Sequence, residues 1–403
     1  MSLSVFEPYS LYLFAVIASL AVSLFSIPNI IYIAKRKRLF DVPDNHRKLH
    51  TRVVPNLGGI GIFFAFFIAA SLLIKPDFTT WNFVATACLI LFITGLKDDL
   101  VTIGSSKKFI AQAIAAVITV WLAGVRLHSL GGLFGIYELP IWASIPFSVI
   151  GCIFVTNAFN LVDGIDGLAG TIGVFITTML GALLAAYGNV SAAVIAFSMS
   201  GALLGFLKSN ISPATIFMGD TGSLIIGFVV SVLSILTINA YHAGGSVSHV
   251  VVSSQGVLVV TLAILFVPVF DTFRVFTMRI LRGHSPFSAD RTHLHHYLLD
   301  IGLSHTRTVG VILGCNILIT ILALLVQRLN INLALGILVL FMGMLLGVLL
   351  YLRNRHLLSG KKQLSNGVKV KAEHYEQTLA FPNSVSVAGK SIHLEESKLV
   401  GKS

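Results

Sequence analysis

Apolar runs of about 20 residues, each long enough to cross roughly 30 Å of hydrocarbon as a helix, recur along most of this 403-residue chain. A soluble fold cannot hide that many, because hydrophobic residues make up 55% of the sequence and charged residues only 11%. We predict an all-α polytopic membrane protein with about eleven transmembrane helices. The predicted spans are 11–34, 55–74, 80–96, 108–125, 142–160, 168–187, 191–208, 221–241, 254–276, 307–328 and 331–352.

The positions of lysine and arginine predict the orientation, since cytoplasmic loops retain basic residues. If the segment 35–54 is cytoplasmic, all but three of the 28 lysines and arginines fall on that side; the exceptions are Lys75, Arg126 and Arg328. The amino terminus is then outside and the carboxyl terminus cytoplasmic. The net charge of +11 reflects this topology and a cytoplasmic surface facing membrane lipid, so we expect no nucleic-acid partner.

The composition changes after the last span. We predict a transmembrane domain over 1–352 and a polar cytoplasmic tail over 353–403 that is disordered or loosely bound to the membrane surface, with a weak amphipathic helix near 361–379 as an alternative.

The unusual polar residues gather at the predicted cytoplasmic ends of the spans. Asp98 and Asp99 follow one span, Asp163 and Asp166 follow another in NLVDGIDGLAG, and Asp220 precedes a third in FMGDTGSL. Taken singly, the first pair could be a solvated helix end, the second pair a polar turn and Asp220 a helix N-cap. Five acids at one membrane face favour a shared site instead.

Such a site needs a cation. Two carboxylates about 6 Å apart repel by roughly 3 kcal/mol at an effective dielectric constant near 20. Oxygen ligands suit Mg²⁺ or Mn²⁺, and Mg²⁺ usually binds one or two protein carboxylates together with substrate phosphate. The sequence therefore predicts an acidic, metal-dependent phosphate site.

Basic and imidazole groups can supply the opposite charge. In DRTHLHHYL, Arg291 can grip phosphate, while His293, His295 and His296 can donate hydrogen bonds or stabilise developing charge. A zinc site and a solvated histidine-rich loop are the alternatives. Lys48, or its neighbour Arg47 or His50 in the first basic loop, could meet anionic substrate, or the loop could simply anchor the topology.

Asp271 raises a separate question, because it lies in or at the end of span 254–276 with Arg274 three residues later. Helical spacing lets the two pair, so a structural ion pair and a direct role both stay open.

Together, NAFNLVDGIDGLAG, FMGDTGSL and DRTHLHH resemble the polyprenyl-phosphate N-acetylhexosamine 1-phosphate transferase superfamily, also called glycosyltransferase family 4. The chain is most similar to the bacterial undecaprenyl-phosphate N-acetylglucosamine 1-phosphate transferases. HLHH in place of a continuous triple histidine separates it from the phospho-N-acetylmuramoyl-pentapeptide transferases, which stay as an alternative.

The resemblance implies roles for individual residues. Catalytic roles fall to Asp98, Asp99 and His295, and metal binding to Asp220 and Asp163. The implied substrate-binding residues are Asn160, Asp166, Asn210, Phe217, His293 and His296, to which the charge pattern adds Lys48 and Arg291.

The resemblance also implies the reaction. N-acetylhexosamine 1-phosphate, with N-acetylglucosamine as the expected sugar, passes from a UDP-sugar to undecaprenyl phosphate with release of UMP. We expect a multi-pass protein of the bacterial cytoplasmic membrane with a cytoplasmic active site, Mg²⁺ as cofactor and a homodimeric state. An ion-coupled transporter is the alternative from another class, since intramembrane acids often mark ion pathways.

Overall fold

The computed structural model describes residues 7–39, 54–242, 252–253, 256–283 and 292–379. Within these residues the chain consists of helices, one short β-hairpin and the loops that connect them. It divides into two units, Met1–Arg353 and Asn354–Ser403, and the described part of the second is the helical continuation of α13 (Ile331–Leu379). The domain boundary and the disorder of the tail stay predictions.

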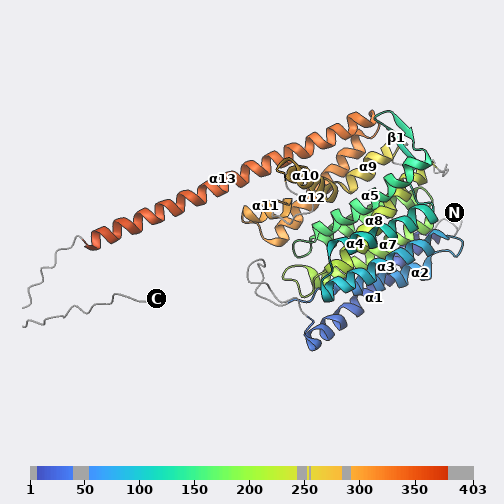
Figure 1. The fold of residues 1–403 in the computed structure, drawn as a ribbon, viewed down its shortest axis with the longest axis horizontal. Coiled ribbons are helices and arrows are strands. Elements are labelled where there is room, and N and C mark those ends of the chain that lie inside the picture. Colours follow the sequence, from blue (N-terminus) through green and yellow to red (C-terminus); the bar gives the residue numbers. More distant parts are fainter. Residues whose placement is uncertain (1–6, 40–53, 243–251, 254–255, 284–291, 380–403) are drawn as a thin grey trace, which may run out of the picture. The chain divides into compact units, whose positions relative to one another are not determined.

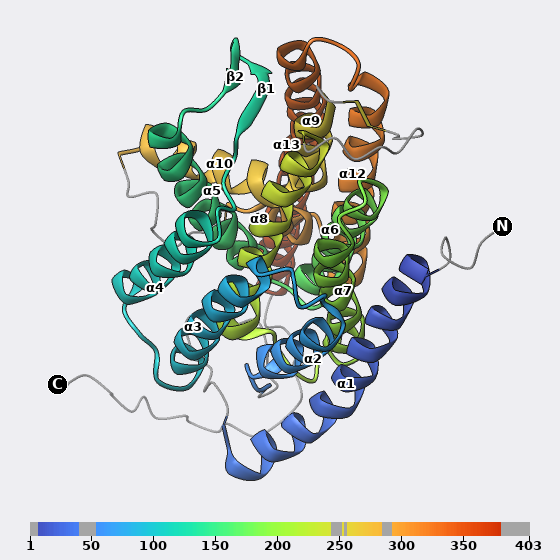
Figure 2. The same ribbon diagram turned by 90° about the vertical axis from the view of Figure 1, so that its right-hand side faces the viewer.

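Three helices pack side by side at one edge of the first unit: α1 (Glu7–Lys37), α2 (Gly58–Leu73) and α7 (Val190–Asn210) (Figure 2). Ser23 of α1 donates a hydrogen bond to the Ala202 carbonyl of α7 at 2.8 Å. The two backbones approach closely, since Gly201 has no side chain: a Cβ there would lie 2.3 Å from the Val16 carbonyl oxygen. Small residues at such crossings are typical of helix packing in membranes.

The helix α8 (Gly219–His242) lies inside the bundle, against α2, α3 (Thr80–Val101), α5 (Ile141–Val162) and α6 (Leu168–Ala186) (Figure 2). Glycines of its neighbours set its position. A Cβ at Gly59 would lie 2.2 Å from the Gly222 nitrogen, and one at Gly95 would lie 2.5 Å from the Thr221 Cα. On the other side, a Cβ at Gly227 of α8 itself would lie 2.8 Å from the Thr156 Cα.

A helix and a hairpin connect α3 to α5. The helix α4 (Ser105–Val117) continues as a single π-helical turn, η2 (Ile118–Leu122). The antiparallel strands β1 (Ser129–Leu133) and β2 (Ile136–Glu138) then pair Ser129 with Glu138 and Leu133 with Ile136.

The predicted span 254–276 is not one straight helix. Instead α9 (Gly256–Ile264) and α10 (Phe266–Leu281) meet at an angle of 77°. Asn316, from α12 (His305–Val326), bonds to the backbone groups exposed at the break: its amide nitrogen donates to the Ile264 carbonyl at 2.9 Å, and its amide oxygen accepts from the Val267 N–H at 3.2 Å. The short helix α11 (Leu294–Asp300) packs beside α12 (Figure 1).

Every predicted span coincides with helical structure. Seven helices of the described residues are long and apolar enough to cross a membrane, or eight if α9 and α10 count as one bent span. The protein is therefore an all-α polytopic membrane protein. The number of eleven spans and the orientation of the termini stay predictions.

Candidate functional site

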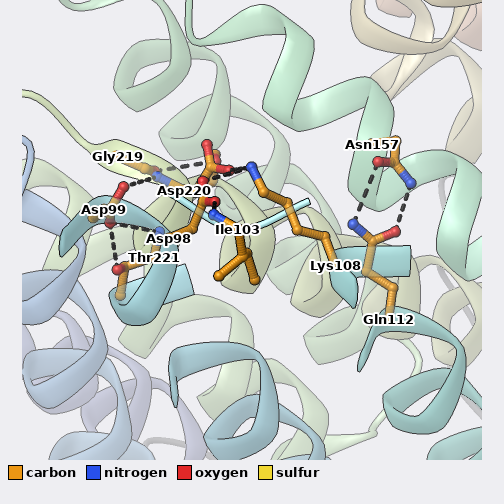
Figure 3. Close-up of polar contacts among 10 residues, drawn as sticks. Asp98, Asp99, Ile103, Lys108, Gln112, Asn157, Gly219, Asp220 and Thr221 are labelled. Atoms are coloured by element: carbon orange, nitrogen blue, oxygen red, sulfur yellow. Dashed lines mark hydrogen bonds and ion pairs between the residues drawn. The ribbon is translucent and has the colours of Figure 1, made fainter. Parts of the chain in front are cut away.

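Two of the predicted acids meet at one lysine. Asp98 lies in the last turn of α3, Asp220 in the first turn of α8 and Lys108 in the first turn of α4. The Lys108 Nζ lies 2.5 Å from Asp98 Oδ2 and also pairs with Asp220 Oδ2, so one ammonium bridges two carboxylates from different helices (Figure 3). The Ile103 N–H donates to the other Asp98 oxygen at 2.6 Å.

Asp99 turns the other way, toward the start of α8 (Figure 3). Its carboxylate accepts hydrogen bonds from the Asp220 N–H at 2.8 Å, the Thr221 N–H at 3.0 Å and the Thr221 hydroxyl at 2.5 Å. Asp99 thus satisfies free N–H groups of the α8 N-terminus from a neighbouring helix. The Asp220 side chain is left to face Lys108, so the N-cap alternative for Asp220 is wrong.

This close approach depends on Gly219. The residue has a φ of +71°, and a Cβ there would lie 2.6 Å from Asp99 Oδ2. Any other side chain would therefore strain the backbone and push Asp99 away from the helix end.

Asp163 adds a third carboxylate. It directly follows α5, at the start of the loop that leads into α6. Burial raises the pKa of Asp163 to about 7, and the nearby carboxylates of Asp220, Asp99 and Asp166 add to the rise. The loop therefore extends the acidic cluster formed by α3 and α8.

Asn210 and Asp166 tie this loop to the segment before α8. The Asn210 amide oxygen accepts from the Gly167 N–H at 3.0 Å, and its amide nitrogen donates to the Ile216 carbonyl at 2.9 Å. The Asp166 carboxylate accepts from the Ala214 N–H at 3.2 Å and lies 3.5 Å from His305 Nδ1. Asn210 is buried and bonded at both ends of its amide, so it braces the two loops.

Phe217 belongs to the same segment. Its N–H donates to the Pro55 carbonyl and its carbonyl accepts from the Gly58 N–H, both at 2.9 Å. The predicted substrate residue Asn160 lies in the last turn of α5 and is half-buried.

The histidine motif is anchored by Asp271. His293 Nδ1 lies 3.0 Å from Asp271 Oδ2, and the Leu294 N–H lies 3.2 Å from both Asp271 oxygens. Arg274 donates to Asp271 at 2.7 Å and also to the Thr292 carbonyl. The predicted Asp271–Arg274 ion pair is therefore confirmed, and it holds the start of α11.

His295 brings the histidine motif to the loop 163–167 between α5 and α6, called the aspartate loop below. A Cβ at Gly164 would lie 2.3 Å from His295 Nε2, so the ring rests directly on that glycine. Nε2 is buried and has no hydrogen-bond partner among the described residues. Burial lowers the pKa of His295 to about 3, with a further decrease from His296, whose ring centre is 4.3 Å away. The ring is therefore neutral at physiological pH.

Two predicted substrate residues, Lys48 and Arg291, lie outside the described residues. Sequence reasoning in turn missed Lys108, which we counted only as a basic residue near a span. Its sole signal was the Lys107–Lys108 pair at the start of an apolar run on the acidic face. It also missed Gln112, one helical turn on, which exchanges amide hydrogen bonds with Asn157 at 2.6 and 3.3 Å and ties α4 to α5 (Figure 3).

The donor set can be tested against a metal. Within the described ranges, no three His, Cys, Asp or Glu side chains form a ready-made metal cage, which gives the zinc alternative no support. Asp98 and Asp220 nevertheless converge on one position, which the side-chain ammonium group of Lys108 occupies. Carboxylates of this number and kind fit Mg²⁺, which completes its shell with water and substrate phosphate.

Comparison with known proteins places these helices in a family. The profile described as "Glycosyl transferase family 4" matches residues 81–238, which include Asp98, Lys108, Asp163 and Asp220. The "Probable undecaprenyl-phosphate N-acetylglucosaminyl 1-phosphate transferase" of Bacillus subtilis is 33% identical over 80% of this chain and 87% of its own length.

The chain belongs to glycosyl transferase family 4.

Two further members of the family extend the comparison. The "Undecaprenyl-phosphate alpha-N-acetylglucosaminyl 1-phosphate transferase" of Yersinia pestis is 31% identical over 72% of this chain and 78% of its own length. The "Decaprenyl-phosphate N-acetylglucosaminephosphotransferase" of Mycobacterium tuberculosis is 32% identical over 66% of this chain and 70% of its own length.

Proposed function

We propose that this membrane enzyme transfers N-acetylglucosamine 1-phosphate from UDP-N-acetylglucosamine to undecaprenyl phosphate, forming a lipid diphosphate and releasing UMP. One observation carries the proposal: within the residues that match family 4, Asp98 and Asp220 from two helices meet at the ammonium group of Lys108 from a third. The names of the relatives supply the sugar phosphate and the lipid acceptor.

Charge is the main obstacle in this reaction, since both substrates are anions. In the proposed site, Asp220 and Asp163 would hold Mg²⁺, or Mn²⁺ in its place, and the bound cation would neutralise phosphate charge. Lys108 supplies a second positive charge beside the same carboxylates. The neutral imidazole of His295 can donate a hydrogen bond to a phosphate oxygen without repelling the metal.

The acceptor needs orientation more than activation. The second pKa of a phosphate monoester is about 6, so a lipid phosphate is mostly dianionic at neutral pH. We therefore assign Asp98 the role of orienting this phosphate for direct attack, and Asp99 a supporting role at the end of α8. Direct attack inverts an isotopically chiral β-phosphorus, whereas retention would indicate a covalent aspartyl phosphate.

The donor would bind across the two loops braced by Asn210. In this arrangement Asp166, Asn160 and Phe217 would line the nucleotide side, and His293 and His296 would lie near the phosphates. Lys48 and Arg291, outside the described residues, keep their predicted roles in binding anionic substrate. The site would face the cytoplasm at the inner membrane of a bacterium, where a soluble donor and a lipid acceptor meet, and two copies would form a homodimer.

The decisive experiment uses the purified protein, undecaprenyl phosphate, Mg²⁺ and a panel of UDP-N-acetylhexosamines, with the lipid product as readout. We expect a product with UDP-N-acetylglucosamine, loss of product on chelation with EDTA, and recovery with Mg²⁺ or Mn²⁺. Asp220→Ala should abolish transfer. Asp77→Asn, at an exposed acid in the loop between α2 and α3, should leave the rate unchanged.

Each alternative has its own outcome. Product only with UDP-N-acetylmuramoyl-pentapeptide would assign the chain to the pentapeptide branch. Absence of any lipid product, together with Asp220-dependent ion flux in proteoliposomes, would support the transporter.

A further inference from the structure

The helix α11 carries His295, yet it has only seven residues. A helix of this length is not stable by itself in water, so contacts with other elements must hold it in place. Because the His295 ring rests on Gly164, any movement of α11 moves the ring relative to the aspartate loop.

The two ends of α11 are held by different elements. Its start is fixed by Asp271 of α10, which accepts from the Leu294 N–H and pairs with His293. Its last residue, Asp300, accepts a hydrogen bond from the Arg353 Nε of α13 at 2.9 Å, and a terminal guanidinium nitrogen of Arg353 lies 2.8 Å from the same carboxylate oxygen.

The apolar side chains of α11 are incompletely packed, so they contribute less to holding the helix in place. Leu294 and Leu298 line an apolar pocket of about 200 Å³ that is open on one side and is lined further by residues of α10, α12 and α13 up to Leu352. Both leucines are buried, but side chains that line a pocket make fewer packing contacts than side chains in filled space. The polar contacts at the two ends therefore matter more for this helix than for a fully packed one.

Tyr297 joins the two anchors. The Arg353 guanidinium lies 4.3 Å from the centre of its ring, and the Arg274 guanidinium, already paired with Asp271, lies 5.3 Å from the same centre. An ion pair whose side chains are 27% and 38% exposed contributes little alone. Contact of the same guanidinium with a buried ring adds to it.

We infer that Arg353 is a positioning residue: from α13 it fixes α11 through Asp300 and Tyr297, and thereby sets where His295 stands against Gly164. This inference rests on the proposed function for its catalytic consequence, but not for its structural one. It also gives α13, which lies beyond the matched residues 81–238, a part in the site.

The test follows two readouts in the full chain: hydrogen exchange of the α11 amides and steady-state kinetics of transfer. Arg353→Gln and Asp300→Asn should each speed exchange within 294–300. Each should also lower kcat roughly tenfold while changing the KM for UDP-N-acetylglucosamine less than about twofold, since misplacement of a catalytic group acts on the transition state. Arg328→Gln, at an exposed arginine between α12 and α13, is the matched control and should change neither.

The double variant Arg353→Asp with Asp300→Arg restores the ion pair in reverse. It should recover much of the slow exchange and much of kcat, which a variant that merely unfolds cannot do. Tyr297→Phe should keep wild-type exchange and Tyr297→Leu should not, because only the first keeps a ring between the guanidiniums.

Two results would overturn the inference: unchanged α11 exchange in both single variants, or faster exchange with unchanged kcat. If the wild type transfers no sugar phosphate at all, the proposed function fails, while the exchange measurements still decide whether Arg353 holds α11.

Discussion

At the scale of single residues, Lys108 is the side chain whose substitution should most directly disturb the acidic cluster. Its ammonium is the counter-ion of Asp98 and Asp220, and removing it would leave two adjacent carboxylates repelling each other. We expect Lys108→Gln to lower the transfer rate roughly a hundredfold, a loss typical of removing one charge-stabilising group from an active site.

The neighbouring residue provides the control for this measurement. Lys107 is exposed, so Lys107→Gln changes the same charge on the same helix without touching the acids. A comparable loss in both variants would mean that only the net charge of α4 matters.

Gly164 is the second residue whose substitution gives a sharp expectation. A Cβ there would lie 2.3 Å from His295 Nε2, so Gly164→Ala must displace either the loop or the histidine. We expect at least a roughly tenfold loss of transfer rate.

Gly151 of α5 is the matched control, because a Cβ there would meet nothing within 4 Å. Gly151→Ala should keep the wild-type rate and slightly raise thermal stability. Wild-type activity in Gly164→Ala would show that the contact with His295 has no role in transfer.

At the scale of elements, the interaction of Asp99 with α8 links two distant helices. Asp99→Asn keeps the shape of the side chain but loses one oxygen that accepts from Thr221 or Asp220. We expect a loss of about 1 kcal/mol in stability, as for other helix caps, seen as a lower thermal midpoint of the purified protein. An unchanged midpoint would contradict the capping role, and Asp77→Asn again serves as the control.

The break between α9 and α10 shows what the sequence could not reveal about an element. The run 254–276 is mostly apolar, with Asp271 and Arg274 near its end, and we predicted one span from it; Pro268, just after the break, is a local sign of an interruption. The bend depends on Asn316, more than 40 residues later, which bonds to both sides of the break. The local pattern therefore predicts a helical run, whereas the side chain that bonds to the broken backbone belongs to another helix and cannot be identified from this run.

At the scale of the whole molecule, the orientation can be tested directly. In a variant without the three native cysteines, a cysteine introduced at Lys107 should react with a membrane-impermeant maleimide only after the cells are permeabilised. A cysteine introduced at Phe134, on the exposed hairpin, should react in intact cells. Labelling in the opposite order would reverse the predicted topology.

The helices and the acids of the candidate site could be predicted because hydropathy and residue type can be read from short stretches of sequence. The apolar runs are helical. Asp98 and Asp220, which we predicted at the same membrane face, both contact Lys108. Lys108 and Arg353 could not be assigned, because their partners belong to other helices and the sequence does not state which helices touch. Asp99 was predicted as catalytic only, since its contact with α8 appears only once α3 and α8 lie together.

The glycine contacts around α8 bear on how the enzyme accommodates its substrates. Backbone atoms of α2, α3 and α5 lie this near on three sides of α8, so its one carboxylate, Asp220, is held in position before any ligand arrives. In the proposed reaction, adjustment to the substrates would then fall to the loops around Asp220 and not to α8 itself.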